Sequence, residues 1–127
     1  MPEVQLTQAP ISSADADRFV AGWIAAFNAH DVEAVVAHYH PEVEYYSPFI
    51  VDLVDPSGRL VGRDALGAYL AAAFERFPDL HFEPPLLVAS GVGSITFHYR
   101  SVRDLHALET LVFGPDGLVV RAHCQYR

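Results

Sequence analysis

The segment that most constrains this chain is its closing stretch, ALETLVFGPDGLVVRAHCQY, which runs from Ala107 to Tyr126. Two apolar runs flank Gly114-Pro115-Asp116-Gly117, where proline pre-sets φ and glycine accepts a positive φ without steric penalty. The pattern predicts a β-hairpin. Its strands are too apolar to face water on both sides, so another layer of the protein must cover one face.

The earlier part of the chain supplies helices that can form this layer. Ser12 or Ser13 can cap a first helix, and Asp31 a second helix over Val32–Tyr39 that is ended by Pro41. A third helix is expected between Gly62 and Pro78. In the first and third helices, apolar residues recur at helical spacing: Phe19, Val20, Trp23, Ile24 and Phe27, then Leu66, Tyr69, Leu70, Ala73, Phe74 and Phe77.

Strands are expected over Val43–Val51, Leu80–Val88 and Ser94–Val102, before the closing hairpin. Helices gathered early and strands late indicate an α+β fold, in which three N-terminal helices pack on a curved, mostly antiparallel sheet. Such a cone-shaped α+β barrel encloses a pocket suited to a small ligand. We expect a single domain over residues 1–127, with residues 1–12 as a loose N-terminal arm.

The composition limits the classes of binding partner and the cellular compartment that we expect for this protein. The formal net charge is −8 and lysine is absent, which argues against nucleic acid as a partner. No apolar run approaches the roughly 18 residues that a membrane helix needs, and MPEVQLTQAP lacks the pattern of a secretory signal. The single cysteine, Cys124, favours the cytoplasm. No metal-ligand spacing or nucleotide-binding fingerprint is present, so neither a metal nor a cofactor is expected.

Three blocks carry a family resemblance: GWIAAFNAHDVEAVVAHYHPEVEYYSP, LVGRDALGAYLAAAF and LETLVFGPDGLVVRAHCQY. They resemble the nuclear-transport-factor-2-like superfamily, and within it the SnoaL-like and ketosteroid-isomerase-like branch, over residues 14–126.

An apolar sheet that is exposed on one side invites pairing, so we also expect a homodimer through the open sheet face.

The resemblance implies where catalytic groups would lie. Ketosteroid isomerases of this superfamily use an aspartate base, a tyrosine and a protonated acid that together handle a proton and an oxyanion. In an ungapped comparison these positions fall on Ser47, Trp23 and Glu109. Because serine cannot act as a carboxylate base at neutral pH, steroid isomerisation by the usual aspartate base is not expected.

Glu109 is the first candidate catalytic residue. It lies on an apolar strand, and a buried carboxylate is costly unless it is paired, hydrogen-bonded or protonated. The alternative is a structural acid satisfied by Arg100, by Arg121 or by a backbone donor.

His123 is the second candidate, as a proton carrier opposite Glu109. It shares one face of the last strand with Gln125, and a bulge would change which face of that strand lines the pocket. The candidate ligand-binding residues are Trp23, Tyr45, Ser47 and Gln125.

Two classes of function follow. The first is an acid–base enzyme of isomerase, cyclase or dehydratase type that acts on a small apolar or carbonyl-containing compound. The second is a non-catalytic ligand-binding or dimerisation domain that keeps the scaffold without the base. A site similar to that of scytalone dehydratase, built on histidines and tyrosines, also stays open because His98, His123, Tyr45 and Tyr46 are available.

Overall fold

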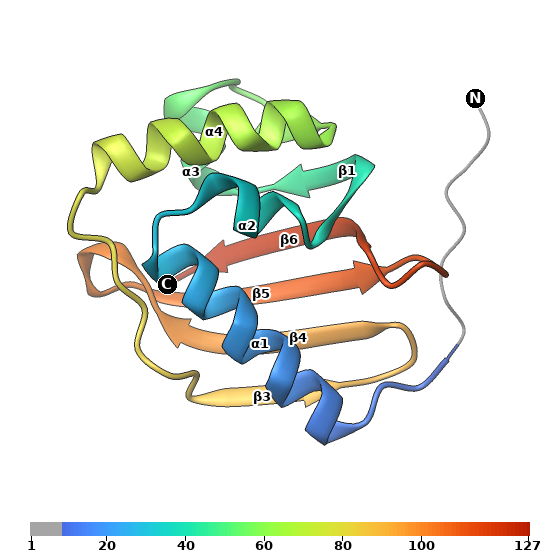
Figure 1. Cartoon of the computed structure of the whole chain (residues 1–127). Helices are drawn as coiled ribbons and strands as arrows, with labels where there is room; N and C mark the ends of the chain where they lie inside the picture. The colour runs from blue at the N-terminus through green and yellow to red at the C-terminus, as the bar shows by residue number, and fades with distance from the viewer. Residues whose placement is uncertain (1–8) are drawn as a thin grey trace.

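The computed structural model describes residues 9–127, which form four α-helices and a six-stranded sheet (Figure 1). The helices are α1 (Ser13–Asn28), α2 (Val32–Val36), α3 (Pro48–Leu53) and α4 (Arg63–Arg76), and the 3₁₀ turn η1 spans Val102–Asp104. The strands are β1 (Tyr39–Tyr46), β2 (Arg59–Val61), β3 (Leu87–Ser90), β4 (Ser94–Arg100), β5 (His106–Phe113) and β6 (Val119–Tyr126).

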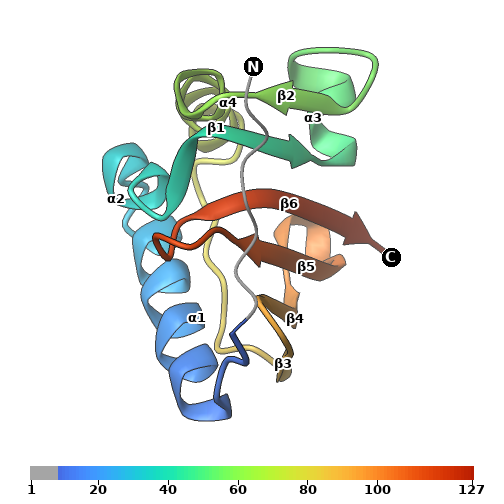
Figure 2. The same ribbon diagram turned by 90° about the vertical axis from the view of Figure 1, so that its right-hand side faces the viewer.

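The sheet is curled and unclosed, with the strand order β2-β1-β6-β5-β4-β3. All neighbouring strands are antiparallel except β1 and β6, which are parallel. Helices α1, α2 and α4 lie across one face (Figures 1 and 2). The expected α+β architecture, with helices packed on a curved, mostly antiparallel sheet, is confirmed.

The closing hairpin is also confirmed. Gly117 has a φ of 80° in the turn, a conformation that glycine adopts without steric penalty. The Gly114 amide donates to the Leu118 carbonyl at 2.8 Å. A register shift between Val112 and Phe113 marks a bulge, beyond which Glu109 of β5 stands directly opposite Cys124 of β6.

The core lies between the helices and the inner face of the sheet. Trp23 of α1 is fully buried and its indole N–H donates to the Tyr39 hydroxyl at 3.0 Å. Its ring packs against the rings of Phe27, Phe82 and Phe97. Aromatic side chains of this size dominate the burial energy of a small domain.

Two expected boundaries around residues 37–51 are wrong. The second helix ends at Val36, and Tyr39 begins β1 instead of ending the helix. Pro41 lies inside β1 at a register shift against β6, where its missing N–H is tolerated. The strand expected over Val43–Val51 stops at Tyr46, because Ser47 caps α3 and Pro48 occupies its first turn.

The strand expected over Leu80–Val88 is also wrong at its start. The paired part is β3, at the edge of the sheet, preceded by a hydrogen bond from the Leu86 amide to the His98 carbonyl at 2.8 Å, and the segment with Pro84-Pro85 before it is irregular. Of the expected N-terminal arm, residues 1–8 lie outside the described residues, while Pro10 forms a bridge with Val92. Within the described part of the chain, no helix is long and apolar enough to span a bilayer.

Candidate functional site

A cavity opens between the inner face of the sheet and helices α3 and α4. Its volume is about 480 Å³, which includes the open space at its mouth. The walls are mostly aromatic and aliphatic, and the polar groups among them are one carboxyl, four phenols and one serine hydroxyl. The lining residues are Phe27, Tyr45, Phe49, Leu53, Tyr69, Leu70, Ala73, Phe74, Phe77, Leu80, Phe82, Tyr99, Ser101, Val102, Glu109 and Tyr126.

Glu109 supplies the only carboxyl group in this lining, and it is 1% exposed to solvent. Alternation along β5 points it inward, where Tyr99 of the neighbouring strand donates to its Oε1 at 3.1 Å. Its Oε2 has no hydrogen-bond partner among the described residues. Burial raises the pKa of Glu109 to about 7, an increase that the Cys124 thiol and the Tyr99 hydroxyl moderate. The carboxyl can therefore donate or accept a proton near neutral pH.

The phenols around Glu109 are neutral hydrogen-bonding groups. Burial, followed by the charge of Glu109, raises the pKa of Tyr45 and of Tyr99 well above the usual value for tyrosine. Burial likewise raises the pKa of Tyr69, and the Ser47 hydroxyl moderates that increase. The pKa of Tyr126 is raised by burial and then by Cys124. Each phenol therefore keeps its proton near neutral pH. The Tyr99 hydroxyl donates its hydrogen to Glu109, so the phenols left as candidate donors to a bound molecule are Tyr45, Tyr69 and Tyr126.

Of the residues predicted to bind ligand, Tyr45 lines the cavity. Ser47 is buried at the end of β1, where its hydroxyl accepts from the Phe49 amide at 3.3 Å and caps α3. Trp23 lies behind the cavity wall with its only N–H donor occupied by Tyr39. The structure therefore gives Ser47 and Trp23 local structural contacts, and brings only Tyr45 to the cavity together with Glu109.

His123 and Gln125 lie on the opposite face of the sheet from Glu109. The reason is register: Glu109 pairs with Cys124, so the inward positions of β6 are Ala122, Cys124 and Tyr126. The His123 ring stacks on Tyr46 with 4.5 Å between centroids and 1° between ring planes. The structure therefore separates His123 and Gln125 from the cavity.

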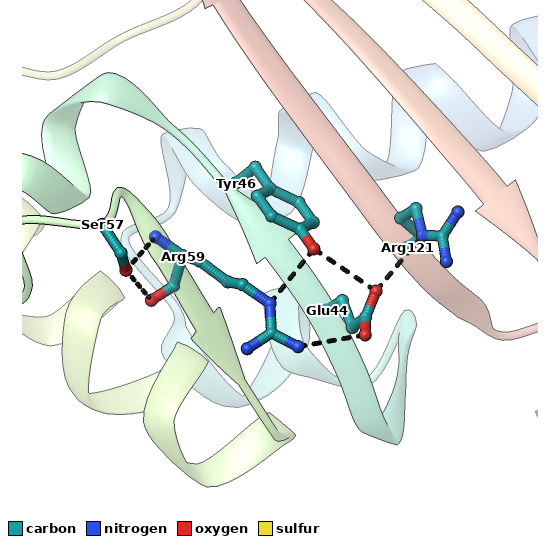
Figure 3. Close-up of polar contacts among 5 residues, drawn as sticks. All are labelled: Glu44, Tyr46, Ser57, Arg59 and Arg121. Carbon is teal, nitrogen blue, oxygen red and sulfur yellow. Dashed lines mark hydrogen bonds and ion pairs between the residues drawn. The ribbon is translucent and has the colours of Figure 1, made fainter. Parts of the chain in front are cut away.

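The outer face carries its own polar network, drawn in Figure 3. Glu44 Oε1 accepts from Arg59 at 3.1 Å, and Glu44 Oε2 accepts from Arg121 at 3.3 Å. Arg59 also donates to the Tyr46 hydroxyl at 3.1 Å (Figure 3). The Arg59 hydrogen bond, followed by Arg121, holds the pKa of Glu44 below its usual value. Neither Arg100 nor Arg121 reaches Glu109, because Arg121 binds Glu44 and Arg100 binds Asp104 and His106.

Three of the cavity phenols, Tyr69, Tyr99 and Tyr126, were not expected at the site from the sequence. A signal was present for Tyr99, because it shares the apolar face of its strand with Ile95 and Phe97. Among residues 9–127, no group of three His, Cys, Asp or Glu side chains converges as a metal site.

Comparison with known proteins gives a family and several structural neighbours. The SnoaL-like domain family matches residues 20–125 of this chain. A SnoaL-like protein of unknown function from Burkholderia thailandensis is 45% identical, with a TM-score of 0.86 over 93% of this chain and 99% of that one. A search of curated proteins finds no match.

Two further solved structures share the fold at low identity. A putative polyketide cyclase from Sinorhizobium meliloti is 16% identical, with a TM-score of 0.72 over 91% of this chain and 100% of that one. TerC, co-crystallised with polyporic acid, is also 16% identical, with a TM-score of 0.70 over 87% of this chain and 89% of that one.

Proposed function

Since this chain belongs to the SnoaL-like domain family, we propose that its cavity binds a small, largely apolar organic molecule and that Glu109 transfers a proton to or from it. The observation that carries the proposal is the state of Glu109, a buried carboxyl with one oxygen unpartnered and a pKa of about 7. A group with a pKa near the working pH is the most effective acid–base catalyst. The proposed reaction is of isomerase, cyclase or dehydratase type.

The proposed chemistry needs one ionisable group. In its ionised form Glu109 takes a proton from a carbon next to a carbonyl, and the electron pair of that C–H bond moves onto the carbonyl oxygen. A neutral phenol such as Tyr45 or Tyr69 donates a hydrogen bond to the resulting enolate. Glu109 then returns the proton to the same carbon or to another one. Ser47 takes no part in these steps, because its hydroxyl is not a base at neutral pH.

Proton exchange in deuterated water tests the proposal. With 2-tetralone as an apolar ketone probe, the wild type should accelerate incorporation of deuterium next to the carbonyl, followed by proton NMR. The Glu109→Gln variant should lose most of this acceleration, roughly 100-fold or more, because general acid–base catalysis contributes on this order. Glu75→Gln, at an exposed position of α4, is the matched control. A Glu109 pKa near 4.5 in an NMR titration would contradict the proposed role.

A non-catalytic binding domain is the second candidate, and one observation favours it. The two positions that would carry the remaining catalytic groups, Ser47 and Trp23, make structural hydrogen bonds instead. This candidate predicts that an apolar probe binds the cavity with the same affinity in the wild type and in Glu109→Gln. Neither protein should then accelerate deuterium incorporation into the probe.

We further propose a homodimer formed through the outer face of the sheet, and a cytoplasmic location in keeping with the single, buried Cys124. Support for the dimer comes from two exposed leucines on this helix-free face, Leu87 at 65% and Leu108 at 44%. Both lie in the same cross-strand row, on either side of His98. Sedimentation velocity should give a dimer for the wild type and a monomer for Leu108→Glu. A wild-type monomer at micromolar concentration would contradict this assignment.

A further inference from the structure

Two arginines lie against the aromatic rings at the wall of the cavity. The guanidinium carbon of Arg103, in η1, is 5.5 Å from the centre of the Phe77 ring and 6.0 Å from that of Phe49. The guanidinium carbon of Arg76, at the end of α4, is 5.6 Å from the centre of the same Phe77 ring. Because Phe49 and Phe77 both line the cavity and the two arginines are exposed, the two cations stand where the wall of the cavity meets the solvent.

These arginines differ from five of the other six in the described chain, and the sixth, Arg127, forms no ion pair with the described residues. Arg18, Arg59, Arg100 and Arg121 each form an ion pair with a carboxylate, and Arg63 donates to a backbone carbonyl. Within residues 9–127, Arg76 and Arg103 make only ring contacts. A guanidinium group that rests on an aromatic face keeps its N–H donors free in its own plane, where they can bind a carboxylate in a bidentate way.

The backbone presents Arg103 in a conformation that has a cost. Arg103 and Asp104 have φ values of 57° and 58°, in the left-handed region that side chains with a Cβ seldom adopt. The turn is held by a hydrogen bond from the Ser101 amide to the Leu105 carbonyl at 2.8 Å and by the ion pair between Arg100 and Asp104. Such strained positions concentrate at functional sites. Here the turn also brings Ser101 and Val102 into the lining of the cavity.

The two ends of the cavity differ in charge. The interior holds the buried carboxyl of Glu109, whose ionised form would repel an anion placed beside it. The opening holds two cations that are unpaired among the described residues, on a chain whose formal net charge is −8. A ligand with a single negative charge would therefore place that charge at the opening and its apolar part inside.

We propose that the ligand of this cavity is an apolar or aromatic carbonyl compound that also carries a carboxylate, with the carboxylate held at the opening by Arg103 and Arg76 and the apolar, carbonyl-bearing body extending toward Glu109. This assignment deepens the function proposed above and rests on it. Arg103 and Arg76 are then the residues that determine specificity for the anionic group, separate from the proton transfer at Glu109.

A pair of isosteric probes tests the proposal. Naphthalene-2-carboxylate and the neutral naphthalene-2-carboxamide have the same apolar body, so calorimetric titration of both isolates the contribution of the charge. The wild type should bind the carboxylate roughly tenfold more tightly, as charge-assisted hydrogen bonds allow. Because exposed charges are screened by salt, this preference should shrink as the ionic strength rises.

Variants locate the effect. Arg103→Asn removes the cation and keeps a residue that tolerates positive φ, and together with Arg76→Gln it should abolish the preference for the carboxylate while affinity for the amide stays within about twofold. Arg18→Gln, an exposed arginine on α1, should leave the preference unchanged. The salt dependence of the wild type gives the same answer if a variant does not fold.

The results of these titrations distinguish a failure of the carboxylate assignment from a failure of the proposed binding function. Equal binding of both probes to the wild type, or an unchanged preference in the double variant, would overturn the inference and leave the cavity as a binding site. Failure of both probes to bind at millimolar concentration would contradict the binding site itself, and the inference with it.

Discussion

Tyr99 on β4 donates its phenolic hydrogen to Glu109 on β5 at 3.1 Å, within the core where both residues are 2% exposed or less. The contact satisfies the oxygen Oε1 of the carboxyl, whereas Oε2 has no hydrogen-bond partner among the described residues. The pair therefore links the packing of the sheet to the acid–base state of the cavity.

Replacement of Glu109 by glutamine should change how stability depends on pH. Because the folded pKa of about 7 lies above the usual 4.5, the stabilising contribution of this group is complete below pH 4.5 and is lost as the pH rises through 7. Glutamine does not titrate. From pH 4 to pH 8 the wild type should therefore lose about 3 kcal/mol of unfolding free energy relative to the variant. Urea unfolding across this range measures the shift, and parallel curves for the two proteins would contradict it.

Loss of the Tyr99 hydroxyl should raise the pKa of Glu109 further. The hydroxyl donates to the carboxyl and favours its ionised form, so Tyr99→Phe removes a contribution that lowers the pKa. We expect a loss of about 1 kcal/mol in stability from the missing hydrogen bond. NMR titration of the labelled glutamate side chain measures the pKa. Tyr45→Phe is the matched control, because Tyr45 makes no hydrogen bond to Glu109, and an equal effect of both variants would contradict the assignment.

The sequence predicted the closing hairpin and the placement of Glu109 because both follow from short-range patterns. Alternation along β5 and the turn at Gly114–Gly117 depend only on neighbouring residues. The inner face of β6 could not be decided in the same way. The extra residue is Val120 of β6, opposite the step from Val112 to Phe113, and this bulge sets which of His123 and Cys124 faces Glu109. No residue in the turn specifies it.

Helix α3 was missed although its sequence signal was present. Ser47 followed by Pro48 is a typical cap and first turn of a helix, but the apolar alternation of the preceding strand masked it. The location of Arg103 is a different case. Its left-handed backbone is imposed by the turn between β4 and β5 and by the Arg100–Asp104 pair, which are contacts that the local sequence does not reveal.

Removal of the Ser47 hydroxyl should weaken α3 and with it one wall of the cavity. Ser47→Ala deletes the group that accepts from the Phe49 amide, and loss of a helix cap costs about 1 kcal/mol. Phe49 lies in the lining, so affinity for an apolar probe should fall as well. Ser13→Ala, at an exposed position beside the cap of α1, is the control and should change neither unfolding nor binding. An unchanged unfolding midpoint for Ser47→Ala would show that the cap does not stabilise α3.

The Glu44 network on the outer face should contribute modestly and depend on salt. Glu44→Gln removes the partner of Arg59 and Arg121, and exposed ion pairs of this kind contribute at most about 1 kcal/mol each. Because the pKa of Glu44 is lowered in the folded protein, its contribution is present above the ordinary glutamate pKa and is lost as the pH falls through the folded value. Unfolding at low and at high salt should show the difference between the proteins shrinking with added salt, and a salt-independent difference would argue against an electrostatic origin.

The position of His123 gives a test that separates the two faces of the sheet. His123→Phe keeps an aromatic ring stacked on Tyr46 but removes the imidazole, which is the group that could carry a proton. Because His123 and Glu109 lie on opposite faces, the variant should leave the Glu109 pKa and any proton exchange in the cavity unchanged, with stability altered by less than about 0.5 kcal/mol. NMR titration of Glu109 and the exchange assay provide both readouts. A loss of exchange of roughly 100-fold would instead identify His123 as the proton carrier and would require β6 to turn its other face to the cavity.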